Sequence, residues 1–130
     1  MSSEIFVSRF ENGGPAPLDL SAARELLAPH VVAEDPSLNL VQISTGERES
    51  ADVYFSGPGT VTFHHAGGEG VMDLLAELLR RLDAVAVVPG GPVIVRREAD
   101  REGLPAGMAD VFPVVVALTG AAIAEAIRTA

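Results

Sequence analysis

The stretch that decides the fold runs from Thr60 to Leu82 and reads TVTFHHAGGEGVMDLLAELLRRL. Its first residues alternate polar and apolar side chains, as a half-buried strand does, and the glycine-rich residues 66–70 follow as a turn. After the turn, Glu77 is placed to pair with Arg81 one helical turn later. Aliphatic residues recur there at helical spacing and form one apolar stripe, at Val71, Leu74, Leu75, Leu78 and Leu82. The stretch therefore predicts a strand, a turn and an amphipathic helix.

The preceding residues predict a β-hairpin with a definite register. Residues 51–56 alternate like residues 60–65, and Gly57-Pro58-Gly59 separates the two runs. A slip of one residue would invert every side chain and expose half of the core, so a three-residue loop is expected. This register gives the hairpin one core face. The other face then carries Asp52, Tyr54, Ser56, Thr60, Thr62 and His64.

The rest of the chain reads as short strands, with two further helices at residues 18–28 and after Thr119. Asp19 or Ser21 is a plausible N-cap of the first helix, and Thr119 can cap the second. Residues 11–15 read as a loop, residues 30–36 as a connector, and residues 97–102 as a charged helical turn. The order predicts the α+β class, with a single-layer, mixed and mostly antiparallel sheet of about 5–6 strands and two or three helices on one face. We expect one globular domain over residues 1–130.

The amino-acid composition limits the classes of protein to which the chain can belong. The chain has 130 residues, 48% of them hydrophobic, and no cysteine. This supplies a core and excludes disulfides and thiolate metal sites. The first residues lack the basic region and apolar run of a signal peptide. Apolar runs such as residues 111–118 are shorter than the roughly 18–20 residues that span a bilayer. A cytoplasmic location is therefore expected.

The charge of the chain limits the kinds of partner that it is expected to bind. The net charge is −9, and all nine basic residues are arginine. Nucleic-acid binding and binding to an anionic membrane both depend on neutralising phosphates, so neither is expected. An acidic surface speeds encounter with basic proteins. Arg96, Arg97 and Arg101 form a small basic island, which reads either as a solvated turn or as a rim that binds carboxylates.

The sequence predicts no cofactor. Residues 66–71 match neither GxGxxG nor GxxxxGK[ST], and Glu69 would repel a phosphate. His64 and His65 are adjacent, and adjacent residues on a strand point to opposite faces, so both imidazoles are not expected to reach one metal ion. Zinc sites also need three or four ligands. We therefore expect neither a nucleotide nor a metal site.

Asp52 opposite His64 is the sharpest chemical pair. A carboxylate beside an imidazole is the arrangement of a general base. A nucleophile would have to come from Ser56, Thr60 or Thr62, and no G-x-S-x-G turn is present. The pair is therefore read as an ordinary cross-strand contact, and no catalytic residue is assigned. The alternative is a polar cleft around Asp52, Tyr54 and His64 in an enzyme or a small-molecule binder.

The uncovered face of the sheet carries the main functional hypothesis. If Ile5 and Val7 point inward, Phe6 and Phe10 point outward beside Tyr54, and such a patch suits a protein interface. Alternatively, this first strand is central and buried on both faces. The hypothesis is a non-catalytic domain that binds a protein, either itself as a homodimer or another protein as an inhibitor-like or immunity-like partner. The expected binding residues are Phe6, Phe10, Asp52, Tyr54, Thr62 and His64.

Overall fold

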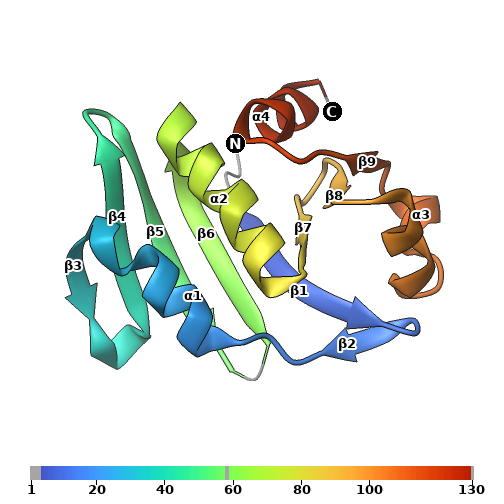
Figure 1. Cartoon of the computed structure of the whole chain (residues 1–130), viewed down its shortest axis with the longest axis horizontal. Coiled ribbons are helices and arrows are strands. Elements are labelled where there is room, and N and C mark those ends of the chain that lie inside the picture. Colours follow the sequence, from blue (N-terminus) through green and yellow to red (C-terminus); the bar gives the residue numbers. More distant parts are fainter. Residues whose placement is uncertain (1–3, 58, 130) are drawn as a thin grey trace.

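The computed structural model describes residues 4–57 and 59–129 and contains one mixed, nine-stranded sheet (Figure 1). The strands are β1 (Ile5–Glu11), β2 (Gly14–Ala16), β3 (Val31–Asp35), β4 (Leu40–Gly46), β5 (Glu49–Ser56), β6 (Thr60–Gly67), β7 (Val85–Val87), β8 (Val93–Val95) and β9 (Val114–Val116). The α-helices are α1 (Leu20–Leu27), α2 (Glu69–Leu82), α3 (Met108–Val111) and α4 (Gly120–Arg128). The 3-10 helices are η1 (Ala28–His30), η2 (Pro36–Leu38) and η3 (Glu98–Gly103).

The strands follow the order β3-β4-β5-β6-β1-β7-β8-β9, and β2 pairs with the end of β1. Every pairing is antiparallel except that of β8 with β9. The α+β class is thus confirmed, but the expected 5–6 strands were too few. Residues 11–15 contain a two-residue turn, with Asn12 and Gly13 both at positive φ, which brings β2 back against β1. The connector at 30–36 contains edge strand β3.

The hairpin of β5 and β6 has the predicted register. Asp52 lies opposite His64, Tyr54 opposite Thr62, and Ser56 opposite Thr60. The residues between them are buried on the inner face, at Val53, Phe55, Val61 and Phe63. The period-2 pattern therefore correctly predicted both strands and their pairing.

Helix α2 lies across the inner face of the sheet, with α1 and α4 on the same side (Figure 1). Its predicted stripe is buried, and Met72 and Leu79 are buried beside it. Glu77 forms its hydrogen bond and ion pair with Arg80, three residues on, and Arg81, the expected partner, acts on this carboxylate only through its charge. The predicted caps are confirmed: Asp19 accepts from the Ala22 N–H and Thr119 from the Ala122 N–H.

Glycines allow two close approaches to α2. A Cβ at Gly70, in the first turn of the helix, would overlap the Thr45 side chain of the β4–β5 hairpin. A Cβ at Gly120, the first residue of α4, would overlap the backbone and side chain of Asp73. These contacts hold the hairpin and the last helix against α2.

A second, smaller core lies on the outer side of the sheet at β7, β8 and β9. It contains Val85, Val93 and Val95 from the strands, against Leu104, Met108 and Phe112 from the segment around η3 and α3. The inward neighbours Ala86 and Ile94 belong to the main core instead. The expectation that helices cover only one face is therefore correct for α1, α2 and α4 and wrong for residues 98–111.

Candidate functional site

A row of five residues crosses the outer face of the sheet from β4 to β7. Leu40 lies opposite Tyr54, Tyr54 opposite Thr62, Thr62 opposite Phe6, and Phe6 opposite Val87. Four of the five have large apolar or aromatic side chains, and the fifth, Thr62, is only 7% exposed because it lies between Tyr54 and Phe6. We call these five residues the transverse row.

No helix in the described part of the chain covers the transverse row in β4, β5, β6 and β1, whereas Val87, at its β7 end, packs against the second core. Helices α1, α2 and α4 pack on the inner face, and η3 with α3 packs on the outer side of β7–β9 only. Leu40, Tyr54, Phe6 and Val87 are each half-buried, so their packing against one another leaves part of each side chain accessible. The result is an apolar ridge across an otherwise polar face.

Polar groups flank this ridge on one side. Gln42 on β4 donates from Nε2 to Asp52 Oδ1 at 3.0 Å. The His64 ring meets the Tyr54 ring edge to face, with centroids 5.0 Å apart and planes at 75°. Asp52 and His64 are register partners as predicted, but the carboxylate bonds to Gln42 and the imidazole packs on Tyr54. The side chains are therefore not arranged as an acid–base couple.

A bulge in β6 changes the expected position of His65. The register with β5 shifts between Ser50 and Asp52, and His65 has φ of +56°, in the left-handed region. The His64 and His65 rings lie with centroids 6.3 Å apart. The argument that these rings must point to opposite faces was therefore wrong, since alternation fails at a bulge. Among residues 4–57 and 59–129, no group of three or more His, Asp or Glu side chains is placed to hold a metal ion.

Phe10 is separated from the other predicted binding residues. It packs against the second core, beside Leu104. Strand β1 lies between β6 and β7, so the alternative of a central first strand describes its place in the sheet. Phe6 nevertheless remains half-buried, because the second core covers the later part of β1 rather than its start.

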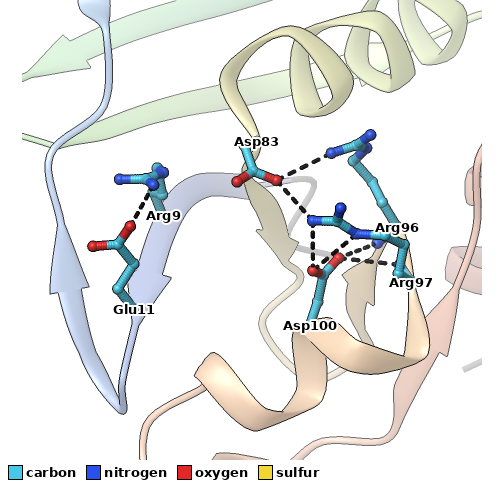
Figure 2. A network of polar contacts seen from close by, with 6 residues as sticks. All are labelled: Arg9, Glu11, Asp83, Arg96, Arg97 and Asp100. Atoms are coloured by element: carbon cyan, nitrogen blue, oxygen red, sulfur yellow. Dashed lines mark hydrogen bonds and ion pairs between the residues drawn. The ribbon is translucent and has the colours of Figure 1, made fainter.

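The three arginines of the island all pair with the chain's own carboxylates, and Figure 2 shows Arg96 and Arg97, although the buried Nε of Arg96 has no hydrogen-bond partner among the described residues. Arg96 and Arg97 both bind Asp83, the left-handed residue that ends α2, at 3.1 Å. Arg97 also binds Asp100, and this hydrogen bond raises the pKa of the guanidinium. Arg101 pairs with Glu98 and donates to the Val114 carbonyl on edge strand β9. These contacts connect the end of α2 to η3, and η3 to β9, so the arginines stabilise the packing of these elements.

Three cavities in the described chain lie away from Asp52, Tyr54 and His64. One of about 400 Å³ lies between α1 and β3, beside Arg24 and Phe55. One of about 650 Å³ lies at the start of α2, and one of about 200 Å³ beside Asp83 and Asp100. No pattern in the sequence predicted the second of these cavities, and neither Leu40 nor Val87 was among the expected binding residues. The period-2 alternation of β4 was the signal for Leu40.

The outer face carries few charged side chains. Across the described outward positions of β4, β5, β6 and β1 there is no arginine, and the only charged side chain of either sign is that of Asp52. The whole chain carries −9 and contains no lysine. The field over this face is therefore negative.

Compared with known proteins, the chain matches no family model, and no curated protein or solved structure is significantly similar to it. None of the helices in the described chain is long and apolar enough to cross a membrane. The function must therefore be argued from the residues themselves.

Proposed function

We propose that this chain is a non-catalytic protein-binding domain that uses the outer face of β4, β5, β6 and β1 to bind a basic partner. The observation that carries the proposal is the transverse row, an apolar ridge with Tyr54 and Phe6 near its centre and no helix over its residues in β4, β5, β6 and β1. Soluble proteins rarely leave such a patch without a use.

The shape and chemistry of the ridge suit a protein rather than a small molecule. Five strands span about 19 Å at the usual strand spacing of roughly 4.8 Å, which is the scale of a protein interface. Aromatic anchors inside a polar rim are typical of binding hot spots. Here Tyr54 and Phe6 are the anchors, and Gln42, Asp52 and His64 belong to the rim.

Charge favours a basic partner over a second copy of the chain. Two copies would each bring a net charge of −9 to the contact and would bring their Asp52 side chains onto one interface. A partner rich in arginine or lysine meets a complementary field, and its encounter is faster at low salt. The catalytic or small-molecule alternative around Asp52, Tyr54 and His64 has less support, because Asp52 is bonded to Gln42 and the three cavities lie elsewhere.

The test has two steps. Native mass spectrometry of the purified chain over a range of concentrations measures self-association. Material captured from host lysate is then compared for the wild type, the double variant Phe6→Ser/Tyr54→Ser, and the control Leu118→Ser. Leu118 is 65% exposed and lies outside the transverse row.

The proposal predicts a monomer that captures a basic protein at low salt. The control retains this protein, and the double variant, still folded by circular dichroism, loses it. If the wild type is a homodimer and the double variant is a monomer, the transverse row mediates self-association rather than binding to a basic partner. Capture that does not depend on Phe6 and Tyr54 would overturn the proposed site.

A further inference from the structure

The largest of the three cavities has a built apolar wall and lies away from the transverse row. Its volume is about 650 Å³, and it forms where the start of β1, the β6–α2 turn, the β7–β8 turn and the end of α4 meet. Side chains of Ile5, Met72, Val88, Pro89 and Ile127 line it. Small-molecule sites in proteins have volumes of roughly 300–1,000 Å³ and mostly apolar walls, so the cavity is of the right size and character.

Four glycines, at positions 67, 68, 90 and 91, leave bare backbone in its wall. At two of these positions the backbone conformation explains why the residue is glycine. Gly68 has φ of +101° and Gly90 has φ of +75°, and a Cβ at Gly68 would also overlap Glu49. Neither a positive φ nor a close neighbour explains the glycine at position 67. Its φ lies outside the left-handed region, and a Cβ there would meet nothing within 4 Å. Neither backbone conformation nor a close neighbour therefore requires glycine at this position, and glycine there leaves this part of the cavity wall without a side chain.

Charges around the cavity disfavour an anion. Arg128 at the rim pairs with Glu125, and Glu4 contributes a carboxylate. The Glu49 side chain lies against Gly68 and Gly70 at the start of α2, so a carboxylate already faces the positive end of the helix dipole. Most of the wall is aliphatic, and burial against it costs a cation its hydration. An uncharged ligand is therefore favoured.

The wall also favours an aromatic ring. The Met72 side chain belongs to it, and a thioether makes favourable contacts with aromatic rings. The bare peptide planes of the glycines and the ring of Pro89 offer flat surfaces for stacking. We propose that this cavity binds a small, uncharged aromatic molecule of about two rings.

The probe for the test is prodan, an uncharged naphthalene dye whose emission rises in apolar surroundings. Its binding is measured by fluorescence and by NMR of ¹³C-methyl methionine. The chain has three methionines, of which Met72 lines the cavity and Met108 belongs to the second core. Met72→Leu assigns the Met72 methyl signal. The proposal predicts saturable binding that shifts the Met72 signal and leaves the Met108 signal in place.

Gly67→Val adds a side chain at the cavity wall, and the same change at Gly57 is the matched control, because a Cβ there also meets nothing within 4 Å. We expect Gly67→Val to weaken prodan binding about tenfold or more, as overpacking does, and Gly57→Val to leave it unchanged. Phe6→Ser/Tyr54→Ser also leaves it unchanged, which separates this site from the proposed protein interface.

Three results would overturn the proposal. The first is no saturable binding of prodan to the wild type. The second is binding that shifts the Met108 signal but not the Met72 signal. The third is a folded Gly67→Val variant that binds prodan as tightly as the Gly57→Val control does. If Gly67→Val does not fold, the methionine signals of the wild type alone decide the question.

Discussion

The ring of His64 meets the ring of Tyr54 edge to face, at 5.0 Å between centroids. The two residues are diagonal neighbours across β5 and β6, since Tyr54 is paired with Thr62 and His64 with Asp52. Such aromatic contacts stabilise a pair beyond the area they bury. The histidine therefore holds the Tyr54 ring of the transverse row in one orientation.

Removing this contact gives the first prediction. His64→Ala frees the Tyr54 ring and lowers stability by about 0.5–1.5 kcal/mol, the usual worth of an aromatic pair. Near-ultraviolet circular dichroism reads the change directly, because Tyr54 is the only tyrosine and the chain has no tryptophan. The control is His30→Ala in η1. An unchanged Tyr54 signal in His64→Ala would show that the ring is held by other neighbours.

The approach of α4 to α2 gives the second prediction. Gly120→Ala places a Cβ on the backbone of Asp73 and forces the helices apart, at a cost of about 1–3 kcal/mol. Gly57→Ala, where a Cβ meets nothing within 4 Å, changes stability by less than about 0.5 kcal/mol. Urea denaturation of both variants measures the difference. Equal stability of the two would contradict the close packing at Gly120.

Asp100 gives the third prediction. Its carboxylate accepts from the backbone N–H groups of Arg96 and Arg97 at 3.2 and 3.0 Å and also pairs with the Arg97 side chain. Asp100→Ala loses this cap and lowers stability by about 1–2 kcal/mol, as loss of a helix cap does. Glu102→Ala, an exposed neighbour in η3, is the control and changes stability little. Thermal unfolding compares the two variants.

Glu77 gives a prediction about pH. The hydrogen bond from Arg80 lowers the pKa of this carboxyl below its ordinary value of 4.5. A carboxyl with a lower pKa in the folded state stabilises the protein above its unfolded pKa, and this contribution disappears as the pH falls through the folded pKa. Glu77→Gln is therefore less stable than the wild type near neutral pH, by a small amount at this exposed site. The two proteins converge in acid, which urea titrations at several pH values would detect.

How far the sequence predicts the fold depends on how local the signal is. The Tyr54–Thr62 register and the stripe of α2 follow from periodicity over adjacent residues, and both are confirmed. Strands β2 and β3 are short, and a short extended segment has no period to detect. The continuous apolar run at residues 84–88 is typical of a strand buried on both faces, but the segment that covers its outer side, around Leu104 and Met108, is distant in sequence.

The candidate site also has a part that the sequence predicts and a part that it does not. The shared face of Asp52, Tyr54, Thr62 and His64 follows from the hairpin register, and Phe6 joins it through its pairing with Thr62. The burial of Phe10 depends on the second core, and the position of His65 depends on a bulge. Neither leaves a periodic mark in the sequence. The cavity beside Gly67 depends on the meeting of four distant segments.

The emission of Tyr54 tests the central claim most directly, because this single tyrosine lies in the transverse row and no tryptophan obscures it. A peptide of alternating arginine and leucine, without tyrosine or tryptophan, is titrated into the protein. The account predicts a saturable change in emission that salt weakens, that Phe6→Ser abolishes and that Leu118→Ser retains. Calorimetric binding of the same peptide with no change in Tyr54 emission would contradict the account, because the basic ligand would then bind elsewhere on the acidic surface.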